Sequence, residues 1–327
     1  LYEWTPNIHQ LKENQETEAA FFELHNMKPS RYQITHPLLL DDGGIVFNNQ
    51  GPLFKINACS NLEWTTNGVF HHSNELDSDN AIWVPSVFQE TAYDKNKFYR
   101  YRDDAIAKVS LTGELLYKKS VSKILEENGY RTLLYGVGPY EADTIHLNDI
   151  QPAQYSTEYW KKGDLLVSVR NRSTVFIYRP STEKIIWLMT GPWLNQHDVD
   201  FIGQSIISVF DNNMIRTKAE NLVDGHNKIF VVDIADGSVS DTYTTALENL
   251  DVRTRTAGRQ EILDNGDLFI EETNHGRILR ISSDNELLWE FVNKSGKGKA
   301  GILNWSRYLT ENQVKDILPI LKRTSCQ

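Results

Sequence analysis

Short apolar runs, each closed by turn residues, recur along most of the chain. The clearest unit begins at His146 and ends at Gly191. Its first apolar run is followed by a Lys162-Gly163-Asp164 turn and by further apolar stretches at 165–171, 174–178 and 184–188. Runs of this length between turn residues are typical of strands in an antiparallel sheet. The pattern therefore predicts four successive strands in this unit.

The same unit recurs at four other places, and each copy begins at a basic residue. The five opening residues are His36, His72, His146, His197 and Arg259. In three units the turn follows the basic residue by seven positions, as from His36 to Gly43. A repeat of roughly 40–50 residues with four short strands is typical of a β-propeller blade. We therefore predict an all-β propeller with five four-stranded blades, and the strand-like Leu1–Pro6 segment leaves a sixth blade open.

The pattern also divides the chain into three parts. Residues 1–34 are polar and are expected to form an N-terminal arm with a helix at 16–27. The propeller is expected at 35–294. Residues 295–327 begin as a linker rich in glycine and lysine, and their amphipathic pattern predicts a helix at 311–321 packed on the propeller.

Composition limits the partners and the cellular setting that the protein can have. A net charge of −10 and a pI near 5.4 argue against nucleic acid or an anionic membrane as the partner. No apolar run is long enough to predict a transmembrane segment. The two cysteines, Cys59 and Cys326, neither require nor exclude a disulfide, so the redox compartment stays open. Because the chain begins at Leu1 within a strand-like segment, we expect that a leader, anchor or domain preceded it.

The basic residues that open the repeats are the candidate chemical groups. The first strand of each propeller blade lines the central channel, so residues at one repeat position would form a ring. Converging imidazoles disfavour one another's charge, and they need a reason such as an anion, a metal ion or catalysis. His36 precedes Pro37 and is equally well explained as a turn residue. His71 and His72 would point to opposite strand faces, and the repeat spacing favours His72 for the channel.

Other recurring residues have structural explanations. The tryptophans of the fourth strands are expected to pack between blades: Trp64, Trp187 and Trp289. The aspartates that recur at the turns are expected to form those turns rather than to act in catalysis: Asp41, Asp164 and Asp267.

Three segments resemble the bacterial arylsulfotransferase family. They are His146-Leu147-Asn148, the predicted strand that contains Arg170, and the run from Trp187 to Gln196-His197-Asp198. Members of that family are β-propellers that move a sulfuryl group between phenols without a nucleotide sulfate donor. The resemblance extends over residues 36–310 by repeat pattern and is close over 146–213.

The resemblance implies a set of site residues. His197 would be the nucleophile that forms a sulfohistidine, and the sulfuryl oxygens would be held by His146, Asn148 and Arg170. His72 would be a further catalytic histidine. The repeat, rather than the resemblance, adds His36 and Arg259 to the ring as candidate substrate-binding residues. Arg172 shares a predicted strand face with Arg170, so either arginine could face the channel. A small aromatic sulfate or other anionic substrate, no cofactor and a periplasmic or envelope location are implied, while a cytoplasmic location stays open.

Two other classes of function stay open. Neutral imidazoles suit Fe, Cu, Zn or Ni, so a metal-dependent oxygenase or lyase could use a four-histidine site: His36, His72, His146 and His197. Arg170 and Arg259 near the ring favour an anion over a divalent cation. A non-catalytic propeller scaffold is the third interpretation, because a fold does not determine a function.

Overall fold

The computed structural model describes residues 2–14, 32–296 and 298–326, which belong to two compact units. Unit 1 comprises residues 1–120 and 307–327, and unit 2 comprises residues 121–306. Each unit is described separately below. The helix predicted at 16–27 lies outside the described residues, and the predicted division into arm, propeller and C-terminal segment stays a prediction.

Unit 1 contains two antiparallel four-stranded meanders. Their strands are β1 (Thr35–Leu39), β2 (Ile45–Asn48), β3 (Gly51–Ile56) and β4 (Leu62–Phe70), then β5 (Glu75–Leu76), β6 (Ala81–Phe88), β7 (Asp103–Ser110) and β8 (Leu115–Ser120). The end of β4 also pairs with the end of β6, where Val69 faces Val87, so the two meanders form one continuous sheet.

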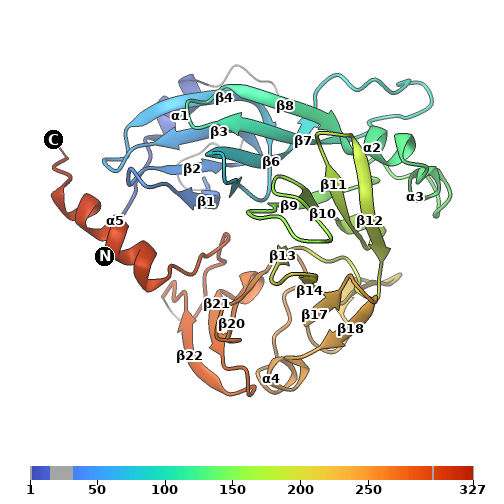
Figure 1. The fold of residues 1–327 in the computed structure, drawn as a ribbon. Coiled ribbons are helices and arrows are strands. Elements are labelled where there is room, and N and C mark those ends of the chain that lie inside the picture. The colour runs from blue at the N-terminus through green and yellow to red at the C-terminus, as the bar shows by residue number, and fades with distance from the viewer. Residues whose placement is uncertain (1, 15–31, 297, 327) are drawn as a thin grey trace. The chain divides into compact units, whose positions relative to one another are not determined.

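Unit 2 contains three more meanders, whose strands lie side by side in chain order (Figure 1). The first is β9 (Leu147–Pro152), β10 (Leu165–Val169), β11 (Thr174–Arg179) and β12 (Lys184–Thr190). The second is β13 (Val199–Phe201), β14 (Ile206–Asp211), β17 (Lys228–Asp233) and β18 (Ser238–Asp241). The third is β19 (Arg259–Ile262), β20 (Leu268–Glu272), β21 (Arg277–Ile281) and β22 (Leu287–Val292). A hairpin of β15 (Met214–Arg216) and β16 (Asn221–Val223) is inserted in the second meander.

These five meanders among the described residues confirm the prediction of an all-β protein built from four-stranded propeller blades. The inner strands are largely apolar because both of their faces are covered. All five residues of β10 are buried, for example, and Leu166 joins Val209 of the next blade and Trp193 in one core cluster. The outer strand β22 is largely exposed and β12 is mostly half-buried, which explains their mixed composition.

Short helices connect or flank the blades. They are α1 (Ile8–Glu13), α2 (Val121–Glu127), α3 (Arg131–Tyr135), α4 (Thr244–Asn249) and α5 (Glu311–Arg323), with 3₁₀ turns at Arg170–Arg172 and Thr273–His275. The predicted C-terminal helix is confirmed as α5, which begins with a capping box of Thr310 and Gln313. No helix among the described residues is long and apolar enough to cross a membrane.

The C-terminal segment is held to unit 1 by covalent and packing contacts. Cys59 and Cys326, 267 positions apart, form a disulfide. Leu321 of α5 packs against Gly43, where a β-carbon would lie 2.9 Å from its Cδ2 atom. Gly43 also has a φ of +81°, a left-handed conformation that favours glycine. Both the backbone conformation and the contact with Leu321 therefore favour glycine in the turn before β2.

Two sequence predictions about strands are wrong. Residues 2–6 form no strand; side chains anchor them instead, with the Tyr2 hydroxyl donating to the Ala58 carbonyl at 2.7 Å and Trp4 Nε1 donating to the Gly43 carbonyl at 3.0 Å. The strand predicted at 165–171 ends at Val169, because the chain turns into a 3₁₀ helix at Arg170. Arg170 and Arg172 are therefore not alternate residues of one strand face.

Candidate functional site

A left-handed backbone residue marks the start of every blade. His36, His72 and His146 have φ values of 48°, 57° and 52°. In the last two blades the left-handed residues are Asn195 and Ala257, which precede His197 and Arg259 by two positions. The five basic residues therefore do not share one repeat position, which corrects the predicted single ring. A non-glycine residue in this conformation costs about 1–2 kcal/mol, and such strain is found preferentially at functional sites.

His197 is a buried imidazole with both ring nitrogens engaged. Its side chain lies just before β13, and the residue is 4% exposed. Nε2 accepts a hydrogen bond from the Ala257 amide at 3.0 Å, and Nδ1 contacts Asn212 Oδ1. Since the amide can only donate, Nε2 carries the lone pair and Nδ1 carries the hydrogen. The surroundings therefore fix one neutral tautomer of His197.

The charge state of His197 follows from its neighbours. Burial, then the charges of Arg170 and His146, place the pKa of His197 well below its usual value, while the Asn212 contact opposes this. The imidazole is therefore neutral at physiological pH. Arg170 and His146, whose charges act on His197, belong with it to unit 2.

Arg170 is a buried cation with weak partners. It is 9% exposed, and its Nη1 reaches Asn171 Oδ1 at 3.4 Å and its Nη2 reaches Met214 Sδ at 3.7 Å. Its Nε has no hydrogen-bond partner among the described residues. Burial and the charge of Arg216 lower the pKa of Arg170, although nearby Asp143 opposes this. A desolvated guanidinium with an unused donor is suited to bind an anion.

His146 faces the same group from the start of β9. Its Nδ1 contacts Asp143 Oδ2 at 2.6 Å, and its side chain is 21% exposed. The Arg170 amide donates to the His146 carbonyl at 3.1 Å, so the backbone holds these two residues opposite each other. A carboxylate at Nδ1 orients an imidazole for proton transfer through its other nitrogen.

Asn148 and Arg259 have positioning contacts. Asn148 Nδ2 donates to the Gln196 carbonyl at 2.7 Å, which fixes the backbone entering His197. Arg259 Nη1 donates to Glu261 Oε2 at 3.0 Å and to the Ser306 carbonyl at 3.1 Å. Both residues lie in unit 2, and their role in substrate binding stays a prediction.

His36 and His72 belong to unit 1, where they form a histidine cluster with His71. The Nδ1 atoms of His71 and His72 lie 2.7 Å apart, and the rings of His36 and His72 are 5.9 Å apart. His71 also lies 3.4 Å from Asp104 through Nε2. The expectation that His71 and His72 point to opposite faces is wrong, because β4 ends at Phe70 and strand alternation stops there.

The described residues contain no group of three or more histidine, cysteine, aspartate or glutamate side chains that could hold a metal ion. The four-histidine metal site left open by the sequence therefore has no support among them.

Comparison with known proteins identifies the family to which the chain belongs. The family model described as arylsulfotransferase (ASST) matches residues 36–294. The chain belongs to this arylsulfotransferase family. Membership supports an arylsulfotransferase-like function in general terms and confirms the resemblance seen in the sequence. Among curated protein sequences, none is similar enough to the chain to count as a match.

The chain is similar in fold to a solved structure with a TM-score above 0.5, and two further structures are less similar. A protein of unknown function from Bacteroides caccae is 14% identical, with a TM-score of 0.55 over 82% of this chain and 85% of that one. The Pan2 WD40 domain of Neurospora crassa is 11% identical, with a TM-score of 0.47 over 78% and 64%. Virginiamycin B lyase from Staphylococcus aureus is 12% identical, with a TM-score of 0.43 over 79% and 69%.

Several residues that contact or lie near His197, His146 and Arg170 in this arylsulfotransferase-family chain were missed by sequence reasoning. They are Asn212, Ala257, Asp143 and Arg216. Asn212 follows β14, and its Nδ2 donates to the carbonyls of Thr254 at 3.0 Å and Ala257 at 2.8 Å. One side chain therefore orients the imidazole and also holds the loop whose amide reaches Nε2. A signal existed, because β14 pairs antiparallel with β13 and so must end beside His197.

Asp211, which precedes Asn212, makes the stability of this region depend on pH. Burial raises the pKa of Asp211 to about 7, although the amides of Leu194 and Asn213 donate to its Oδ1 at 2.8 and 2.7 Å. A raised carboxyl pKa contributes stability that is fully present below the unfolded pKa and is lost as pH rises through the folded pKa. The stabilising contribution of Asp211 should therefore disappear between about pH 4 and pH 7.

We expect Asp211→Asn to remove this dependence. Urea unfolding should measure this: the free energy of unfolding of Asp211→Asn minus that of the wild type should be about 2–4 kcal/mol larger at about pH 8 than at about pH 4. The matched control is Asp236→Asn, because Asp236 is exposed and the pKa of its carboxyl is lowered by hydrogen bonds to Ser238. If the difference in free energy of unfolding between wild type and Asp211→Asn were the same at about pH 4 and about pH 8, the raised pKa of Asp211 would be contradicted.

Proposed function

We propose that this protein transfers a sulfuryl group from an aryl sulfate to a phenolic acceptor through a sulfohistidine on His197. The observation that carries the proposal is the pairing of a neutral, tautomerically fixed imidazole with a buried arginine whose Nε lacks a partner among the described residues. The first group is a competent nucleophile, and the second is a binding group for sulfuryl oxygens.

In the first half-reaction, the Nε2 lone pair of His197 forms a bond to sulfur while the bond from sulfur to the aryl oxygen breaks. The electron pair of that bond leaves with the aryl oxide. Negative charge grows on the leaving oxygen and on the sulfuryl oxygens, and Arg170 opposes it with fixed positive charge. His146, oriented by Asp143, is placed to give a proton to the leaving aryl oxide.

In the second half-reaction, the phenolic acceptor gives its proton to His146, and its oxygen attacks sulfur. The bond between nitrogen and sulfur breaks, and its electron pair returns to Nε2, so His197 becomes neutral again. The protons balance because His146 donates one and later takes one up. Positioning and charge stabilisation do most of the work, as in phosphoryl transfer.

The Ala257 amide makes the resting state of His197 unreactive. Its hydrogen bond occupies the lone pair that must attack sulfur. Attack therefore requires the 254–257 loop or the imidazole to move a short distance. The cost is that of one hydrogen bond, about 0.5–1.5 kcal/mol, which is small beside the barrier that an enzyme must lower.

We also propose an oxidising location such as the periplasm. The Cys59–Cys326 disulfide supports it, because cytosolic thiols are normally kept reduced.

The test is incubation of the whole protein with a chromogenic aryl sulfate, with and without a phenol acceptor. We expect release of the chromogenic phenol that depends on the acceptor, formation of the acceptor sulfate, and a sulfuryl adduct on the His197 peptide after rapid quenching at alkaline pH. Absence of phenol release would reject the proposed activity. Release with the adduct on His146 would reject only the assignment of the nucleophile.

A further inference from the structure

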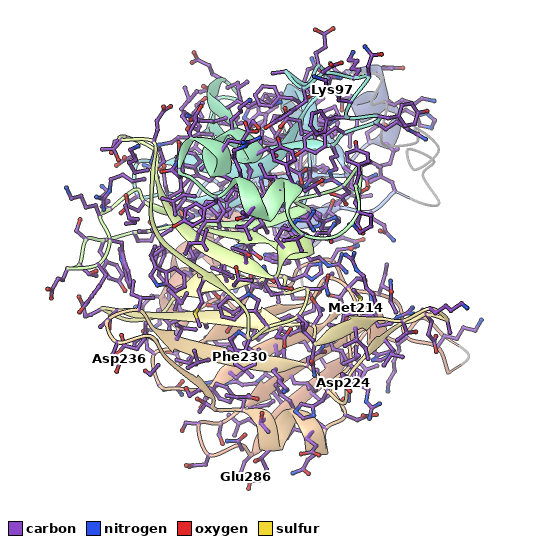
Figure 2. All side chains as sticks on the ribbon, turned by 90° about the vertical axis from the view of Figure 1, so that its right-hand side faces the viewer. Lys97, Met214, Asp224, Phe230, Asp236 and Glu286 are labelled. Atoms are coloured by element: carbon purple, nitrogen blue, oxygen red, sulfur yellow. A yellow bond between two sulfur atoms is a disulfide. The ribbon has the colours of Figure 1, made fainter. Side chains whose placement is uncertain are left out.

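Unit 2 carries a second arginine beside Arg170 on the β15–β16 hairpin. This hairpin is an insertion between β14 and β17, and Arg216 is the last residue of β15. Figure 2 shows Met214, the first residue of the hairpin, and Asp224, which follows its last residue, at the end of this blade opposite Asp236. Met214 Sδ contacts Arg170 at 3.7 Å, so the hairpin begins next to the buried arginine.

The two guanidinium groups converge on one neutral atom. Arg216 Nη2 donates to Asn171 Oδ1 at 2.8 Å, and Arg170 Nη1 reaches the same oxygen at 3.4 Å. Each arginine carries a full positive charge, and the charge of Arg216 helps to lower the pKa of Arg170. Two cations held this close by an amide oxygen repel each other, and a bound anion between them would relieve that repulsion.

The carboxylates near this pair do not remove the need for an anion. Asp143 is engaged with His146 through Oδ2. Glu141 lies 3.5 Å from Arg216 Nη1, and both of these side chains are 43% exposed. An exposed ion pair at this distance contributes little to stability, so Arg216 can exchange it at little cost.

The backbone of the hairpin is nevertheless fixed. Asn195 Nδ2 donates to the Met214 carbonyl at 2.9 Å, and Asn213 Nδ2 donates to the His226 carbonyl at 3.1 Å just beyond the hairpin. From another side, Arg255 Nη1 reaches the Asn221 carbonyl at 3.4 Å. A flexible side chain on an anchored strand is suited to close on a ligand without a rearrangement of the fold.

We propose that Arg216 is a second binding residue for the transferred sulfuryl group. This inference rests on the proposed function. When the substrate binds, the guanidinium of Arg216 leaves Glu141 and, with Arg170, holds the sulfuryl oxygens from the solvent side. Arginine is suited to this role because its planar donors match tetrahedral oxyanions in pairs. The hairpin insertion is thus a part of the anion site.

The test compares Arg216→Gln with Glu141→Gln in the full chain. Arg216→Gln should lower kcat/KM for an aryl sulfate roughly 10- to 100-fold, as expected for loss of one charge-assisted hydrogen bond. Arg216→Lys should retain part of the activity because it keeps the charge. Glu141→Gln breaks the same ion pair but keeps the arginine, so it should leave kcat/KM unchanged or raise it. Equal losses in Arg216→Gln and Glu141→Gln would overturn the inference, because they would show that the ion pair matters only for structure.

Binding of inorganic sulfate, measured by calorimetry, separates this inference from the proposed function. We expect wild type and Glu141→Gln to bind sulfate at least about tenfold more tightly than Arg216→Gln. If the wild type binds sulfate in this way but does not turn over aryl sulfates, the proposed function fails and the role of Arg216 in anion binding stands. Equal sulfate affinity in wild type and Arg216→Gln would overturn the inference even if the enzyme is active.

Discussion

Replacing His197 by alanine is expected to lower kcat for aryl sulfate turnover by roughly four orders of magnitude or more. The substitution removes a nitrogen lone pair that the surrounding contacts hold in a fixed, neutral tautomer and whose imidazole feels the charge of Arg170. His146 is not an equivalent substitute, because its Nδ1 is engaged by Asp143 and its role in the proposal is proton transfer. Phenol release in single-turnover experiments is the measurement.

Asn212→Ala is the graded companion to this experiment. It keeps the imidazole but removes the acceptor that holds the hydrogen on Nδ1, and it also releases the 254–257 loop. We expect a loss of roughly tenfold, the scale of one hydrogen bond. A His197→Ala variant that forms a sulfuryl adduct at the wild-type rate would contradict the assignment, and a His146→Ala variant without any adduct would then identify His146 as the nucleophile.

The blade repeat and the basic residues at its start could be predicted from the sequence, because both recur at regular intervals along the chain. Inner strands such as β10 are buried on both faces and appear as largely apolar runs. The turns that separate them recur at regular intervals. Residues at the blade starts therefore stood out, and two of them, His146 and His197, belong to unit 2, as does Arg170, which the family resemblance indicated.

The exact register could not be predicted, because it is a backbone property. His146 opens its blade in a left-handed conformation, whereas in the next blade Asn195 takes that place and His197 follows two positions later. Counting basic residues along the sequence cannot distinguish these two cases. The error matters chemically, since it would treat His146 and His197 as equivalent when one contacts a carboxylate and the other an amide oxygen.

Arg216 escaped prediction for a different reason. It lies in a polar insertion without hydrophobic periodicity, and its place beside Arg170 depends on a hairpin fixed by side-chain amides such as Asn195. The Cys59–Cys326 disulfide was likewise beyond the sequence, because pairing across 267 positions depends on how α5 packs in unit 1.

Replacing Arg170 by glutamine should separate activity from stability. Truncating a buried, charged binding group typically costs about 2–5 kcal/mol of transition-state binding, so kcat/KM should fall roughly 30- to 5000-fold. Arg170→Lys should lose less, because it keeps the charge but not the planar donors. Because Arg170 also lowers the pKa of His197, Arg170→Gln should move the acid limb of the rate profile to higher pH, whereas Arg170→Lys should not.

Arg170→Gln should lose activity, but it should not lose stability. Arg170 is desolvated, repelled by Arg216 and weakly bonded through a neutral amide and a thioether, so its charge opposes folding. Removing that charge should leave the free energy of unfolding unchanged or raise it by about 1–2 kcal/mol. Urea unfolding of wild type, Arg170→Gln and Arg170→Lys at neutral pH measures this. A loss of stability that parallels the loss of activity would mean that Arg170 supports the fold; stability kept while activity falls means that the buried charge is retained for binding an anion.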